Sequence, residues 1–138
     1  MDNLNPATAF FIVRIFLGIL FFIQGYDKMF NVHIKNVVKT FDPPLTSKHL
    51  PEFFILITAW FTSLIEFFGG FLLIIGFFTN YVLYLLGMDL ILVAIGLGII
   101  RPMWDMQFVF PRLLLLVSLL LMPEEWNVFA CDYFFFSH

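Results

Sequence analysis

Three charged residues stand inside apolar stretches of this 138-residue chain: Arg14, Glu66 and Asp89. A charged side chain in a lipid bilayer is costly unless it is paired, protonated or facing a cavity. One cation beside two carboxylates can hold one of them ionised and leave the other to bind a proton. We therefore predict a proton-handling cluster made of these three residues. An ion pair that only fixes the packing of the helices explains the same residues equally well.

The cluster requires the three residues to lie at one depth in the membrane. Counting about 1.5 Å per residue from the face that carries both termini places Arg14 about 10 Å deep and Asp89 about 12 Å deep. The same count places Glu66 about 16–18 Å deep. Since helix ends are uncertain by a few residues, the sequence predicts that three helices bring the residues to one level.

Small and polar residues repeat around these charges. In the second apolar stretch they recur every four residues, as Thr58, Thr62, Glu66 and Gly70. Beside them Gly69 extends a small-residue surface that another backbone can approach closely. In the first stretch a face turned toward neighbouring helices is formed by Arg14, Gly18, Phe21, Gly25 and Lys28. For ligand contacts beside the cluster we predict Gln24, Thr62 and Gly70.

The elements that position these residues are four apolar segments, at residues 7–29, 53–78, 81–100 and 106–122. Hydrophobic residues make up 62% of the chain, charged residues 12%, and mean hydropathy is +0.98. A soluble domain has about a quarter charged residues, and a spanning helix needs about 20 mainly apolar residues. The sequence thus predicts an all-α integral membrane protein, with residues 1–138 forming one four-helix transmembrane bundle.

Two segments lie outside the predicted bundle. In the long connection, residues 30–52, an apolar spacing typical of a short interfacial helix is formed by Ile34, Val37, Val38 and Phe41. An irregular loop fits so short a run equally well. The aromatic tail, residues 123–138, is too short to span. We expect it to lie along the membrane interface or to pack on a partner.

Charge placement predicts the orientation. One membrane face carries Lys28, Lys35, Lys39, Lys48, Arg101 and Arg112, whereas the other carries Asp2, Glu124, Glu125 and Asp132. The positive-inside rule then puts both termini outside the cytoplasm. Net charge is −3 and the basic residues are scattered, which argues against nucleic acid as a partner.

Metal and haem chemistry finds little support in the sequence. The three histidines, His33, His49 and His138, all fall outside the apolar segments. We therefore predict neither a haem between histidines within the bundle nor a metal site. A single cysteine, Cys131, excludes an internal disulfide.

Two stretches carry a family resemblance: RIFLGILFFIQGYDKMF at residues 14–30 and IEFFGGFLLIIGFFTN at residues 65–80. Together they resemble the DoxX family of small four-helix bacterial membrane proteins. The matching residues are Arg14, Leu17, Gly18, Phe21, Gly25 and Lys28, followed by Glu66, Gly69, Gly70, Gly76 and Thr79. One position departs from the pattern, because Asn80 stands where the family often has a basic residue.

The resemblance implies a bacterial inner-membrane protein. Some family members are membrane subunits of sulfur-oxidation complexes that pass electrons to quinone, others accompany thiol-oxidant defence systems, and many have no known activity. We expect a subunit of a quinone-linked oxidoreductase, with Glu66 as proton donor, Asp89 as its relay partner and Arg14 holding one carboxylate ionised. Electrons would come from a partner protein or a bound cofactor. The alternative is a non-catalytic scaffold or accessory subunit of a larger membrane complex.

Overall fold

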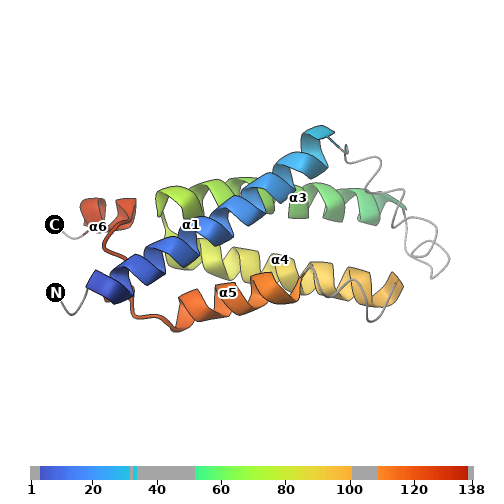
Figure 1. Ribbon diagram of the computed structural model, residues 1–138. Helices are drawn as coiled ribbons and strands as arrows, with labels where there is room; N and C mark the ends of the chain where they lie inside the picture. The colour runs from blue at the N-terminus through green and yellow to red at the C-terminus, as the bar shows by residue number, and fades with distance from the viewer. Residues whose placement is uncertain (1–3, 32, 34–51, 101–108, 137–138) are drawn as a thin grey trace.

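The computed structural model describes residues 4–31, 33, 52–100 and 109–136, and in this part of the chain helices are joined by turns and short irregular segments, without a strand. Four longer helices form the bundle: α1 (Leu4–Tyr26), α3 (Glu52–Ile75), α4 (Thr79–Ile100) and α5 (Phe110–Leu121). A π-helical turn, η1 (Asp27–Asn31), continues α1. The tail folds into η3 (Glu124–Trp126) and α6 (Cys131–Phe136) near the start of α1 (Figure 1).

The predicted helices agree with the observed ones within a few residues. Two described helices are long and apolar enough to cross a membrane, Leu4–Phe30 and Leu56–Ile75. Two further apolar helices, Thr79–Ile95 and Phe110–Leu121, are shorter. The predicted start of the last segment at residues 106–108 and the predicted interfacial helix around residues 34–41 lie outside the described residues.

Glycine fixes how α1 packs against α3. Gly18 lies against Ile74, Gly70 lies against Phe22, and Gly25 lies against Phe67. Each step forward along α1 is therefore matched by a step back along α3, so the two helices run antiparallel in one register. A Cβ atom on Gly25 would stand 2.4 Å from the backbone nitrogen of Phe67. Such close approach of backbones is what small residues permit in membrane helix pairs.

The turn between α3 and α4 is formed by residues 76–78. Gly76 adopts φ +73°, which a residue without a side chain adopts readily. Its N–H donates to the carbonyl oxygens of Leu72 and Leu73 at 2.9 and 3.2 Å, which closes the end of α3. The sequence predicted this connection at Thr79–Asn80, whereas the structure places both residues in the first turn of α4.

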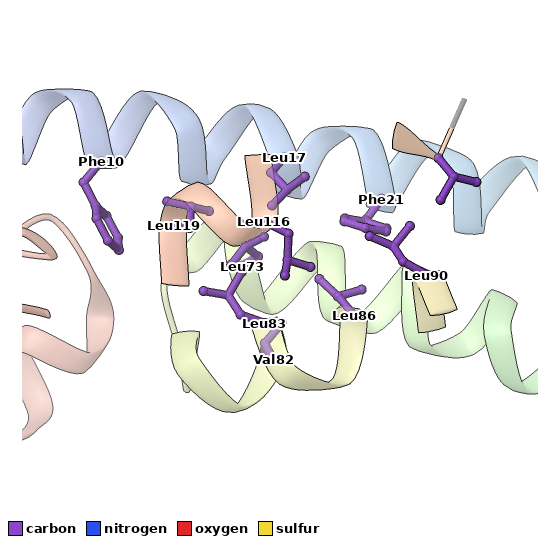
Figure 2. Packing of buried hydrophobic residues seen from close by; sticks show 11 residues of the cluster. Phe10, Leu17, Phe21, Leu73, Val82, Leu83, Leu86, Leu90, Leu116 and Leu119 are labelled. Atoms are coloured by element: carbon purple, nitrogen blue, oxygen red, sulfur yellow. The ribbon is translucent and has the colours of Figure 1, made fainter. Parts of the chain in front are cut away.

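A leucine-rich core fills the middle of the bundle (Figure 2). Every long helix contributes side chains that are 2% exposed or less, among them Leu17, Phe21, Leu73, Leu83, Leu86, Leu90, Leu116 and Leu119. The outward faces of the same helices are rich in exposed Phe, Ile and Leu side chains. A bundle that is apolar on its outer surface as well as in its core matches a protein surrounded by lipid.

Candidate functional site

The first part of the site is an ion pair between α3 and η1. Lys28 Nζ donates to the two carboxylate oxygens of Glu66, at 3.0 Å to Oε1 and 2.8 Å to Oε2. The Glu66 side chain is 1% exposed and that of Lys28 is 21% exposed. Lys28 lies in the π-helical turn that ends α1, and such wider turns recur at functional sites. A buried carboxylate is thus neutralised by a cation that keeps partial contact with the surroundings.

Asp89 is the second carboxyl group of the site. Gly69 of α3 contacts Leu86 of α4. Glu66 lies three residues before Gly69 and Asp89 three residues after Leu86, so on these antiparallel helices Glu66 faces Asp89. The Asp89 side chain is 0% exposed, and neither oxygen accepts a hydrogen bond from any described donor. The Glu66 carboxyl group acts electrostatically on Asp89. A hydrogen bond between two carboxyl groups requires a proton on one of them.

Arg112 adds a second cation from α5. Its charge acts on both Glu66 and Asp89, and its guanidinium carbon lies 6.0 Å from the centre of the Phe21 ring. The sequence analysis did not include Arg112 in the cluster. Three helices and the π-helical turn therefore bring together two carboxyl groups and two cations.

Three further polar residues lie on the elements that form this centre. Thr62 is buried, and its hydroxyl donates to the Ala59 carbonyl oxygen of its own helix at 3.2 Å. Ser63 is fully buried, and its Oγ has no hydrogen-bond partner among the described residues. Oε1 of Gln24, three residues after Phe21 on α1, is also buried without a hydrogen-bond partner among the described residues. These oxygen atoms can therefore accept hydrogen bonds from water or from a proton-bearing group.

Gly70 serves helix packing rather than ligand contact. A Cβ atom there would stand 2.4 Å from the backbone nitrogen of Phe22 and 2.7 Å from the carbonyl oxygen of Gly18. Because α1 occupies this surface, the predicted ligand role of Gly70 is wrong. The prediction that its small size lets another backbone approach is confirmed.

Arg14 does not join the carboxyl groups, and the predicted common level is wrong. Its Nη1 donates to Asn127 Oδ1 and its Nη2 to the Phe129 carbonyl oxygen, both at 2.6 Å. In the α1–α3 register Glu66 lies opposite Tyr26, twelve residues along α1 from Arg14, which corresponds to about 18 Å. The depth count assumed that all helices start at one plane, whereas α1 starts well beyond the end of α3 (Figure 1).

Arg14 instead belongs to a second polar layer, where the tail meets the turn between α3 and α4. Asp132 of α6 accepts hydrogen bonds from the N–H groups of Phe78 and Thr79, at 2.8 and 2.9 Å. Its own N–H donates to the Gly76 carbonyl oxygen at 3.1 Å. Asn127 Nδ2 donates to Thr79 Oγ1 at 3.2 Å. The tail was predicted to lie at the interface or on a partner, and part of it packs on its own bundle.

A half-open cleft of about 260 Å³ lies beside this tail layer. Its lining residues are Phe10, Thr79, Asn80, Met122, Glu124, Asn127, Asp132 and Tyr133. None of the predicted site residues lines it, so the cleft and the carboxyl pair are separate features.

The sequence reasoning missed Lys28 as the partner of Glu66. The signal was present, because Lys28 continues the Gly18–Gly25 face at helical spacing and this face was predicted to meet neighbouring helices. What decides the partner is the register of α1 on α3, which gives Lys28 rather than Arg14 the position beside Glu66. No group of three or more His, Cys, Asp or Glu side chains in the described part of the chain could hold a metal ion.

Comparison with known proteins gives one match. Neither the curated proteins nor the solved structures contain a significant match to this chain. The DoxX family matches residues 9–100, which include most of α1, all of α3 and α4, and the Lys28, Glu66 and Asp89 positions. The apolar helices and this match together indicate a membrane protein. The chain belongs to the DoxX family.

Proposed function

We propose that the protein is a membrane subunit whose Glu66–Asp89 pair holds and transfers a proton for a quinone-linked oxidoreductase. The observation that carries the proposal is Asp89, a fully buried carboxyl group with no described hydrogen-bond donor, facing a carboxylate already neutralised by Lys28. A proton shared between the two groups gives both a hydrogen bond. With that proton the two groups carry one negative charge, which Lys28 neutralises, and Arg112 adds a second positive charge that acts on both.

The pair acts as a proton relay rather than as a group that touches the quinone. Glu66 and Asp89 are 1% and 0% exposed, so a quinone ring has no described path to contact them. Lys28 is the partly exposed member and connects the pair to its surroundings. Reduction of a quinone to a quinol takes two electrons and two protons. The chain's part is to supply protons, while a partner protein or bound cofactor delivers the electrons.

Quinone is assigned on family resemblance, and the membrane location follows the same reasoning. We place the protein in a bacterial inner membrane, with four spanning helices and both termini on the periplasmic face. Lipid and at least one further protein subunit are its partners. The positively charged residues on the η1 side support this orientation under the positive-inside rule.

The experiment is quinone-dependent turnover of the natively purified assembly with Glu66→Gln or Asp89→Asn in this subunit. Both changes keep the side-chain shape and remove the titratable group. Loss of a positioned proton-transfer group typically lowers the rate by about 10²–10⁴-fold. We therefore expect turnover to fall by at least about tenfold. Thr58→Val, on the same helix and exposed, is the matched control. Full turnover in folded Glu66→Gln and Asp89→Asn assemblies would contradict the proposal.

A scaffold role is the second candidate, supported by the tail surface. Phe134 and Phe135 of α6 are 71% and 72% exposed, and exposed aromatic groups are common in docking surfaces. Replacing both by Ser leaves the Asp132 and Asn127 contacts in place. A scaffold predicts loss of co-purifying subunits with this variant and unchanged partners with Glu66→Gln. Retained partners would count against it.

A further inference from the structure

An apolar layer separates the two polar parts of the bundle. All four long helices contribute to it, through Leu17, Leu73, Leu83, Leu86, Leu116 and Leu119, each 2% exposed or less (Figure 2). The layer lies between the tail contacts of Arg14 and Asp132 on the α6 side and the Glu66–Asp89 pair on the η1 side. These leucines belong to one continuous core cluster.

Among the described residues, no inward-facing polar side chain bridges this layer. Between Arg14 and Gln24 every residue of α1 is apolar or glycine, and the same is true of α3 between Glu66 and Gly76. In the corresponding parts of α4 and α5 the polar residues are Tyr81, Tyr84 and Ser118, all exposed. Ser118 donates to the Leu114 carbonyl oxygen of its own helix. A proton therefore has no chain of side-chain hydroxyl or carboxyl groups to follow through the layer.

On the η1 side the polar side chains continue. Ser63 lies one helical turn beyond Glu66 in the direction away from α6, and its Oγ is buried without a described partner. Thr62 is beside it, and Lys28 keeps 21% of its side chain exposed. Unpartnered buried hydroxyl groups of this kind are positions where internal water is bound.

We propose that water and protons reach the Glu66–Asp89 pair from the η1 face of the membrane only, along Lys28 and Ser63, and that the leucine layer closes the α6 face. The pair thus works as the end of a half-channel rather than as a point on a continuous path. The purpose of this one-sided access rests on the proposed function. Its test measures access and needs no quinone turnover, so the failure of either claim is visible without the other.

The test uses a membrane-impermeant, positively charged methanethiosulfonate reagent on sealed vesicles of both orientations. Ser63→Cys, a change of similar size, is made together with Cys131→Ser so that one thiol is present. The unmodified chain carries its only thiol, Cys131, on the α6 side and marks that face. We expect Ser63→Cys and the unmodified chain to react from opposite faces, as read by mass spectrometry.

Variants in the leucine layer provide the matched control. With Cys131→Ser in the background, Leu83→Cys and Leu116→Cys should react from either face roughly a hundredfold more slowly than Ser63→Cys, because the charged reagent must enter an apolar environment. Reaction of Ser63→Cys from the Cys131 face overturns the proposal. The proposal is also overturned if Ser63→Cys reacts from neither face, or if the leucine-layer variants react at the rate of Ser63→Cys.

Discussion

Lys28 Nζ lies 2.8 Å from Glu66 Oε2, although the two residues are 38 positions apart in the sequence. The contact joins the π-helical turn at the end of α1 to the middle of α3. The Glu66 side chain is 1% exposed, so Lys28 is the cation that pairs with a buried carboxylate. Asp89 on α4 completes the centre.

Removing the cation should destabilise the protein strongly. Lys28→Met leaves Glu66 buried and unpaired, and we expect the free energy of unfolding in detergent to fall by about 3 kcal/mol. The double variant Lys28→Met with Glu66→Gln removes both charges and should recover most of this loss. A double variant as unstable as Lys28→Met would contradict the ion pair.

The glycine contacts between α1 and α3 predict a second stability effect. Gly25→Ala places a Cβ atom 2.4 Å from the Phe67 backbone, so the helices must separate, at a cost of about 1–3 kcal/mol. Gly87→Ala is the control, since its nearest contact would be Leu116 Cδ2 at 3.6 Å. The unfolding temperature should fall in Gly25→Ala, and in Gly87→Ala it should fall clearly less or rise relative to the unmodified chain. Equal destabilisation of the two variants would contradict the packing described for α1.

The tail supplies a cap to α4. Asp132→Ala removes the acceptor of the Phe78 and Thr79 N–H groups, and we expect a loss of about 1 kcal/mol. Hydrogen exchange should rise at the first amides of α4. Glu125→Ala, which removes an exposed carboxylate from the same tail, should leave those amides unchanged. Unchanged exchange in Asp132→Ala would show that the tail does not cap this helix.

Arg14 should hold the tail in place. Arg14→Lys keeps the charge, yet a single ammonium group on a shorter side chain cannot make both bonds to Asn127 and Phe129. We expect Cys131 to react faster with a soluble thiol reagent in this variant. Arg112→Lys, at the other polar level, should leave the Cys131 rate unchanged. Equal Cys131 rates in Arg14→Lys and the unmodified chain would contradict this role.

The sequence predicted the helical class and the approximate bounds of the long helices, because length and apolar composition decide these features locally. It also predicted the close packing at Gly18, Gly25 and Gly70, since small residues at helical spacing allow little else. In the structure Glu66 faces Asp89 because one short turn joins α3 to α4 and the two residues lie at similar distances from that turn.

The partner of Glu66 could not be predicted in the same way. No short turn joins α1 to α3, so counting from a common membrane plane placed Arg14 near the level of Glu66, whereas the observed register puts the two about 18 Å apart along α1. The actual register depends on which glycine meets which backbone, as Gly25 meets Phe67. The tail was also out of reach, because Asn127 and Asp132 carry no periodic pattern that marks them as contacts for Arg14 and Thr79.

The central claim is that Glu66 and Asp89 share a proton, and infrared difference spectroscopy of the purified protein tests it most directly. A protonated carboxyl group has a C=O stretching band that a carboxylate lacks, and exchange into D₂O shifts this band. We predict such a band in the unmodified protein and its loss in Asp89→Asn, with Thr58→Val unchanged. A folded protein without the band, or a band that persists in both Asp89→Asn and Glu66→Gln, would contradict the account.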